Sequence, residues 1–99
     1  MAKQHFFFKL IPPRATFPYD IAENEKRLME DHKHYCMDHF NRGTLLAYGP
    51  VMAKDGAFGM AVLEVDARRF GDGDPSVIGG LNRFEIYPMH LAAARAKAS

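Results

Sequence analysis

Several features that mark large classes of protein are missing from this chain of 99 residues. Its single cysteine, Cys36, cannot form an internal disulfide, which favours a reducing compartment. No apolar run approaches the length that is needed to cross a membrane. Residues 1–10, interrupted by Lys3, His5 and Lys9, are too short an apolar stretch for a signal peptide. These absences predict a cytoplasmic protein.

Strong charge is also lacking, because the net charge is +1 and no basic run or acidic tail is present. Nucleic acid is therefore not an expected partner. A glycine-rich phosphate loop and a nucleophile elbow are absent too, and the sequence predicts no cofactor. What is present, 47% hydrophobic and 25% charged residues, is typical of one ordinary globular domain over residues 1–99. A domain of this size buries a limited share of its surface, so pairing with a second copy is expected.

The longest segment without glycine or proline contains residues 21–42, which the spacing of apolar residues predicts to be a helix. Asp20 is expected to cap this helix, with Glu23 as an acidic partner, and Gly43 is expected to end it. His32 falls on the predicted inner face of the helix. That face carries Ile21, Leu28, Tyr35, Cys36 and Phe40.

Four strands are predicted around this helix from alternating or aromatic-rich segments. They span residues 5–11, 44–51, 57–65 and 82–87. Asp55-Gly56 is a strong hairpin signal. Asp66 can cap a short second helix that Gly71 and Gly73 stop, and Asp74-Pro75 starts a further turn. The order of these strands and helices along the chain predicts an α+β fold, a ferredoxin-like βαββαβ sandwich. Its sheet is expected to be antiparallel and four-stranded, its second helix short, and residues 89–99 a C-terminal tail.

The pattern of short motifs along the chain resembles the YCII-related (YciI-like) family. The motifs are His32-Lys33-His34-Tyr35, Gly43, Leu45-Leu46-Ala47-Tyr48-Gly49-Pro50, the Asp55-Gly56 hairpin, and Asp74-Pro75 followed by Gly80-Leu81. Their order and spacing cover residues 6–88. The second helix is roughly one to two turns shorter than is usual in that family.

The resemblance implies a ferredoxin-like protomer that pairs into a dimeric α/β barrel, as a homodimer. It also implies a pocket in which His32 pairs with Asp74 as an acid–base dyad. The family includes a dehydrochlorinase of a chlorinated hydroxyhydroquinone, and the wider fold includes muconolactone isomerases. Most members have no established reaction.

The residues themselves leave two interpretations open for each member of this pair. An aspartate that accepts a hydrogen bond from one imidazole nitrogen would make His32 a competent general base near neutral pH. His32 could equally be a core histidine whose hydrogen bonds are satisfied. Asp74, before Pro75, could be an ordinary helix cap, and one carboxylate can fill both roles.

Other side chains are weaker candidates for a site. Tyr35 and Tyr48 could bind a substrate carbonyl or phenol, and Arg14 could bind a carboxylate, although core and surface roles are commoner. Cys36 could be a nucleophile, but a lone buried cysteine is more often packing. No metal site is predicted, because His32, Cys36 and His39 extend along one helix too far to share an ion.

Two functions are consistent with these residues. The first is an isomerase or lyase, such as a dehydrochlorinase, in which His32 and Asp74 move a proton on a small cyclic or enolisable substrate. The second is a non-catalytic dimeric module that binds a small molecule or assists another protein.

Overall fold

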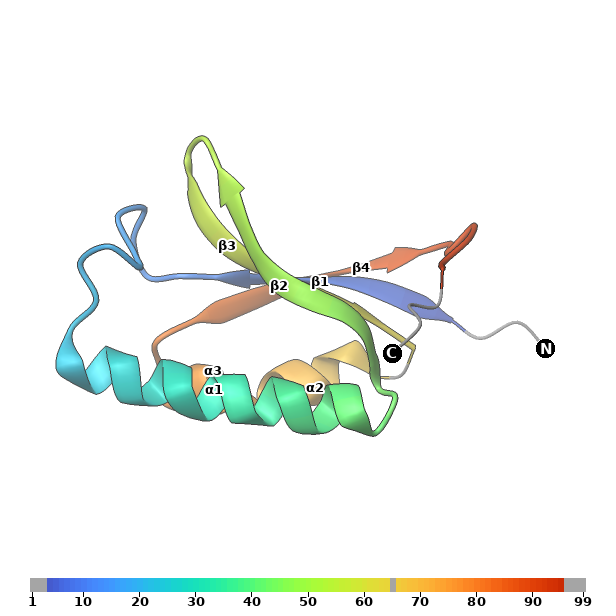
Figure 1. Cartoon of the computed structure of the whole chain (residues 1–99), viewed down its shortest axis with the longest axis horizontal. Coiled ribbons are helices and arrows are strands. Elements are labelled where there is room, and N and C mark those ends of the chain that lie inside the picture. Colours follow the sequence, from blue (N-terminus) through green and yellow to red (C-terminus); the bar gives the residue numbers. More distant parts are fainter. Residues whose placement is uncertain (1–3, 65, 96–99) are drawn as a thin grey trace.

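A four-stranded antiparallel sheet with helices on one face makes up the protein, as Figure 1 shows. The computed structural model describes residues 4–64 and 66–95. The strands are β1 (His5–Ile11), β2 (Leu45–Ala53), β3 (Gly56–Leu63) and β4 (Arg83–Met89). Their order in the sheet is β2-β3-β1-β4, and neighbouring strands are antiparallel. This α+β arrangement is compatible with the predicted ferredoxin-like fold.

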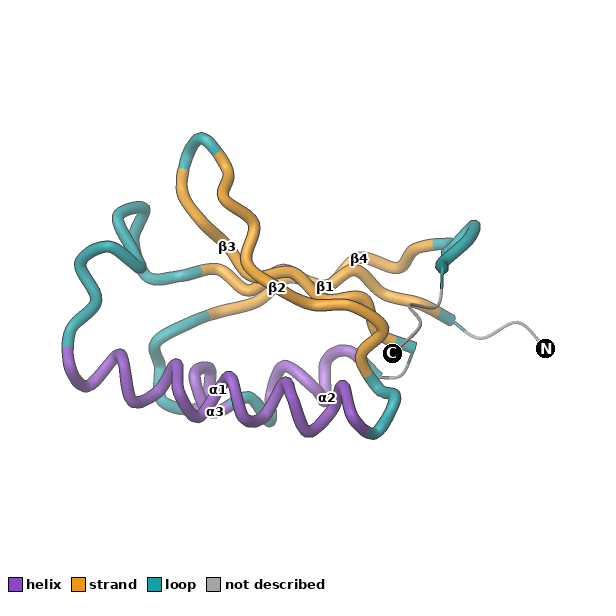
Figure 2. Tube along the Cα trace, viewed as in Figure 1, coloured by secondary structure: helices purple, strands orange, loops and turns teal. Residues whose placement is uncertain are grey.

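Three helices occur in the described residues: α1 (Glu23–Asn41), α2 (Ala67–Asp72) and α3 (Pro75–Ile78). All of them lie on the same side of the sheet, as both ribbon views show (Figures 1 and 2). The second helix is short, as predicted, and its continuation α3 is a single turn. Within residues 4–64 and 66–95, no helix combines the length and apolarity that a bilayer span requires.

The hydrophobic core lies between the sheet and these helices. Phe8 of β1 is 2% exposed and is paired with Ala61 on one side and Ile86 on the other, so these side chains share the helix-facing surface. The Phe8 ring contacts Phe70 of α2 edge-on and stacks on Phe84 of β4, each at 5.1 Å between ring centroids. Burying a side chain of this size contributes roughly 1.5–3 kcal/mol, so this aromatic cluster fixes α2 on the sheet.

The opposite face of the sheet is not covered by any helix of the described residues. Phe7 of β1 points to this face, where its ring lies 6.3 Å from that of Tyr87. Lys9 follows on the same face, with Nζ 4.8 Å from the centre of the Phe58 ring. Val62 is paired with Phe7 and is only partly buried. An apolar surface with interspersed charges is therefore left open.

The predicted cap of α1 is wrong. The helix begins at Glu23 after Ala22, and the side chain of Glu25 accepts a hydrogen bond from the Ala22 amide at 2.9 Å. Asp20 is held in the preceding loop instead, because Thr16 and Arg14 both donate hydrogen bonds to its carboxylate. Gly43 ends the helix region with a φ of +87°, as predicted.

Two strands extend further along the chain than the predicted bounds of residues 51 and 87. β2 continues past Pro50 to Ala53, and β4 includes Pro88 and ends at Met89. Both are edge strands, where a residue without an amide hydrogen is tolerated. Residues 91–95 form neither helix nor strand. Val65, predicted as a strand end, and residues 96–99 of the predicted tail lie outside the described residues.

One residue of the predicted inner face of α1 is misplaced. Phe40 is 47% exposed, and its ring packs at 5.7 Å against Tyr48 on edge strand β2. Cys36, four residues earlier, is 4% exposed and belongs to the core. In the last turn of α1 the inner face therefore passes through His39, whose ring packs edge-on against buried Phe70 at 5.1 Å between ring centroids, and not through Phe40.

Candidate functional site

The side chains of His32 and Asp74 meet beneath the sheet. The Nδ1 atom of His32, on α1, lies 2.7 Å from Oδ2 of Asp74, which immediately precedes α3. Asp74 is completely buried, whereas the His32 side chain is 18% exposed. The structure thus brings together two residues that the sequence separates by 42 positions.

The break between α2 and α3 places Asp74 there. A proline disfavours helical geometry in the residue before it, and Asp74, before Pro75, is extended with φ −69° and ψ 124°. Oδ1 of Asp74 accepts hydrogen bonds from the Ser76 amide at 2.8 Å and the Ser76 hydroxyl at 2.9 Å. One carboxylate oxygen therefore caps α3 while the other contacts His32.

The charge of Asp74 controls the protonation of His32. Burial of the ring is the largest single influence and lowers the pKa of His32, but the hydrogen bonds and charges of Asp74 and Cys36 together outweigh it and raise the pKa from 6.5 to about 10. A buried carboxylate needs a compensating positive charge, which explains why the pKa of His32 is raised and not lowered. His32 consequently carries a proton on both nitrogens at neutral pH, and in this state it donates a proton rather than accepting one.

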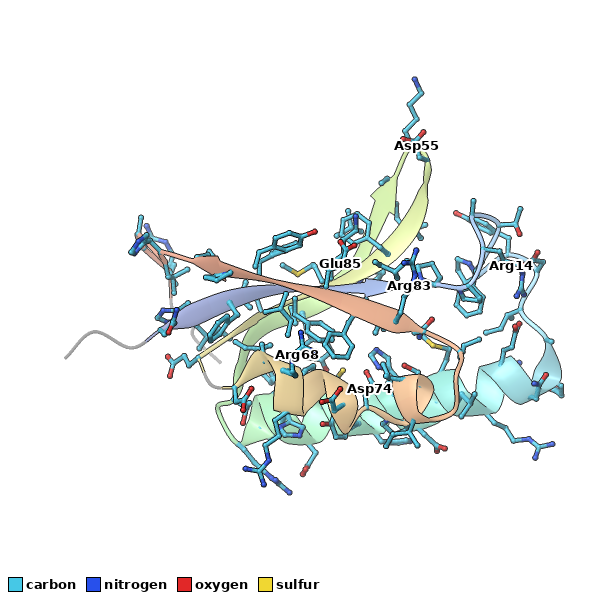
Figure 3. The ribbon with its side chains drawn as sticks, turned by 180° about the vertical axis from the view of Figure 1, so that it is seen from behind. Arg14, Asp55, Arg68, Asp74, Arg83 and Glu85 are labelled. Atoms are coloured by element: carbon cyan, nitrogen blue, oxygen red, sulfur yellow. The ribbon has the colours of Figure 1, made fainter. Side chains whose placement is uncertain are left out.

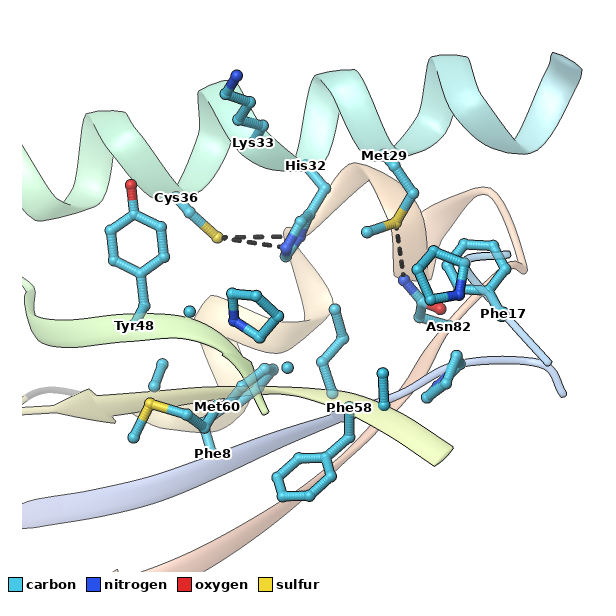
Figure 4. A pocket seen from close by; sticks show the side chains of 18 of the residues that line it. Phe8, Phe17, Met29, His32, Lys33, Cys36, Tyr48, Phe58, Met60 and Asn82 are labelled. Carbon is cyan, nitrogen blue, oxygen red and sulfur yellow. Dashed lines mark hydrogen bonds between the residues drawn. The ribbon is translucent and has the colours of Figure 1, made fainter. Parts of the chain in front are cut away.

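His32 also lines a cavity of about 360 Å³ between α1 and the sheet (Figure 4). Most of its wall is apolar, and the wall comes from α1, α2, β1, the loop after β1, the β2–β3 hairpin and the loop before β4. Asp74 is not part of this wall. Since Nδ1 faces Asp74, the Nε2 side of the ring is the side left for the cavity.

Two more polar side chains belong to the cavity wall. Sγ of Cys36 lies 3.7 Å from Nε2 of His32, and this free thiol is buried. Asn82 is 6% exposed, and its amide nitrogen contacts the sulfur of Met29 at 3.4 Å. Its Oδ1 atom has no hydrogen-bond partner among the described residues. Cys36 remains open to both interpretations, nucleophile or packing.

The two predicted substrate-binding tyrosines differ in position. Tyr48 of β2 lines the cavity and is 37% exposed. Tyr35 does not line it, because its hydroxyl donates a 2.7 Å hydrogen bond to the carbonyl oxygen of Phe70. Burial, with Asp74 nearby, raises the pKa of Tyr35 to about 12. The Tyr35 hydroxyl thus fastens α1 to α2.

Arg14 lies in the loop after β1, away from Asp74 (Figure 3), and does not line the cavity. Its guanidinium binds both carboxylate oxygens of Glu25 at 2.7 and 2.8 Å and Oδ1 of Asp20 at 2.9 Å. The bidentate contact lowers the pKa of Glu25 to about 2. The guanidinium therefore joins this loop to the start of α1.

Sequence reasoning missed Met29, Phe17 and Asn82 as parts of the wall. Met29 precedes His32 by three positions on α1, so helical spacing could have placed it beside the imidazole. Phe17 and Asn82 lie in loops, where no periodicity indicates an orientation. Asn82 was predicted to begin the last strand, but β4 starts at Arg83.

The described residues hold no group of three His, Cys, Asp or Glu side chains that could bind a metal ion. Comparison with known protein families and with curated proteins finds no match to this chain. The chemistry of the site is therefore argued from its own geometry.

Proposed function

We propose that this protein is a small acid–base enzyme of the isomerase or lyase type, in which His32 and Asp74 transfer a proton to a small cyclic or enolisable substrate. The observation that supports this most is that His32, which lines the cavity, forms a 2.7 Å hydrogen bond with the fully buried Asp74 behind it. Strongly shifted groups in a cavity are characteristic of functional sites.

The proposed proton transfer uses the side of His32 that faces the cavity. The Nε2–H bond breaks as a bond forms between that proton and a substrate oxygen on which negative charge develops. The electron pair stays on Nε2 and leaves a neutral imidazole, while Nδ1–H remains hydrogen-bonded to Asp74. Nε2 then accepts the proton from the carbon beside the C–O carbon, the C–H electron pair forms the enol C=C bond, and the imidazolium is restored. Tyr48, which also lines the cavity, is placed to orient the substrate. A general acid of this kind contributes about 10²–10⁴ in rate.

A second candidate function, a module that binds a small molecule without catalysis, is favoured by one observation. Among the described residues, no aspartate or glutamate lines the cavity. An isomerisation also requires a group that removes a proton from carbon, and His32, protonated at neutral pH, can do so only after it has given up its own proton. The site would then hold a ligand and leave it unchanged.

Hydrogen–deuterium exchange at carbon separates the two functions without a known substrate. Cyclic ketones and lactones would be incubated with the protein in D₂O, and loss of C–H signals would be followed by NMR. We expect exchange with the wild-type protein and a loss of about 100-fold or more in His32→Gln. His34→Gln, on an exposed part of α1, is the matched control and should keep full activity. Exchange that His32→Gln leaves intact would refute the proposed role, and no exchange at all would favour the binding module.

We also propose that the chain is a YciI-like domain that forms a homodimer, arranged as a dimeric α/β barrel in the cytoplasm. The support is the sheet order β2-β3-β1-β4, the His32–Asp74 pair and the apolar sheet face that no described helix covers. Placing two such faces together would bury both.

A further inference from the structure

The size and wall of the cavity restrict what can occupy it. Its volume of about 360 Å³ is near the lower end of small-molecule sites, which range from about 300 to 1,000 Å³. Aromatic rings and a thioether form much of the wall, with Phe8, Phe17, Phe70 and Met29 from four different segments. A flat compound of one or two rings matches such a wall, because apolar side chains gain from covering an apolar surface.

His32 provides the charged donor within this apolar wall. Lys33 also lines the cavity, but Figure 4 shows its amino end directed away from it. In the described part of the chain, the only hydrogen-bond partner of Nε2 of His32 is Sγ of Cys36 at 3.7 Å, so this nitrogen has no oxygen or nitrogen partner. A ligand oxygen at this position would satisfy it. A charged N–H donor prefers an ionised oxygen, which it binds roughly twice as strongly as a neutral one.

The charges around His32 limit the ligand to a single negative charge. Asp74 is buried and already neutralised by the imidazolium. With a ligand that carries one negative charge, Asp74, protonated His32 and the ligand together have a net charge of −1. A dianionic ligand would make this sum −2, in an apolar site where charge is costly.

We propose that the cavity binds a small flat ring compound that carries one oxyanion, and that this oxyanion accepts a hydrogen bond from Nε2 of His32. The proposal rests on the proposed function, since it uses the same face of the same imidazole, but it does not require catalysis.

Paired probes of equal shape test the ligand class. Benzoate and 2-naphthoate supply one oxyanion each, benzamide is the neutral counterpart of benzoate, and phthalate is the dianion. Binding at pH 7 would be measured by isothermal titration calorimetry and by chemical-shift changes in ¹H–¹⁵N spectra, which also show that each variant is folded. We expect benzoate or 2-naphthoate to bind about tenfold more tightly than benzamide or phthalate.

Two variants connect this preference to the imidazole. His32→Gln should reduce the affinity for the carboxylates about tenfold while leaving benzamide unchanged, and His34→Gln should bind all probes as the wild type does. Equal binding of benzamide and benzoate, an unchanged preference in His32→Gln, or no binding of either carboxylate would overturn the proposal. Carboxylate binding without deuterium exchange would leave this inference standing and refute catalysis. Deuterium exchange without a preference for the anionic probes would refute this inference and leave the proposed catalysis standing.

Discussion

At the scale of single residues, Asp74 connects local chain geometry to the protonation of His32. Its Oδ1 atom is occupied by the amide and hydroxyl of Ser76, so its side chain cannot rotate without losing two hydrogen bonds. The other oxygen is thereby fixed at 2.7 Å from Nδ1 of His32. A carboxylate held in this way stabilises the imidazolium in the folded protein and has no such partner in the unfolded chain.

This difference predicts a loss of stability at alkaline pH. The pKa of His32 is about 10 in the folded protein against 6.5 for the unperturbed group, so between these values the unfolded chain releases a proton that the folded one keeps. Its contribution to stability is complete below pH 6.5 and is lost as the pH rises through about 10. The slope from one such group is at most about 1.4 kcal/mol per pH unit. Urea unfolding at a series of pH values would measure it.

Two histidine variants provide the control for this measurement. His32→Gln retains a side chain that can donate to Asp74 but has no titration, so its stability should vary less with pH in this range. His34→Gln should keep the wild-type slope, because His34 is exposed on another part of α1. Identical slopes in the wild type and His32→Gln would mean that the pair is not the source of the pH dependence.

At the scale of elements, the contact between α2 and β4 depends on the absence of a side chain at Gly71. A Cβ atom built there would lie 2.5 Å from Cζ of Phe84, whose ring is stacked on Phe8 and has little room to move. We expect Gly71→Ala to lower the free energy of unfolding by roughly 1–3 kcal/mol, despite the better helix propensity of alanine. Chemical denaturation would measure the change.

Gly49→Ala is the matched control for this substitution. Gly49 lies in β2, and a Cβ atom there would meet nothing within 4 Å. Its unfolding free energy should stay within about 0.5 kcal/mol of the wild type. If both variants were equally stable, the packing of α2 on Phe84 would not constrain the fold as argued.

Some helices, strands and caps could be predicted from the sequence, and others could not. The aromatic-rich run identified residues 5–11 as a strand, and Asp74-Pro75 identified the start of α3, because both signals depend on neighbouring residues. The cap at Asp20 failed because Arg14 and Thr16 compete for its carboxylate, and this competition depends on the path of the loop. The strand ends predicted at residues 51 and 87 came too early, because an edge strand tolerates a proline and the edge position depends on sheet order.

Within the site, the sequence indicated His32 by its position on the inner face of α1, whereas its pairing with Asp74 came from the family resemblance. The protonation state did not follow from the sequence. It depends on how completely Asp74 is buried, which is a property of the packed protein. The position of Arg14 likewise depended on Glu25, which lies 11 residues further along the chain.

At the scale of the whole molecule, the uncovered sheet face is the surface through which we expect this chain to contact a second copy. The face carries partly buried apolar side chains such as Phe7 and Val62, with Lys9 and Glu85 among them. Apolar surface in contact with water costs free energy in proportion to its area, so pairing two such faces is favourable. Charges of both signs on one face can form pairs across a two-fold axis.

This arrangement predicts a homodimer that a single charge can dissociate. Val62→Glu places an additional carboxylate on the open face, where pairing would bury its charge at a cost in free energy, and we expect a monomer in analytical ultracentrifugation. Ile78→Glu introduces the same charge on α3, at a side chain that is 71% exposed and far from that face, and it should remain dimeric. A wild-type protein that sediments as a monomer at micromolar concentration, or a Val62→Glu variant that stays dimeric and folded, would show that the sheet face is not the contact. The His32 site would not be affected by that result, because its cavity lies on the opposite side of the sheet, beneath α1.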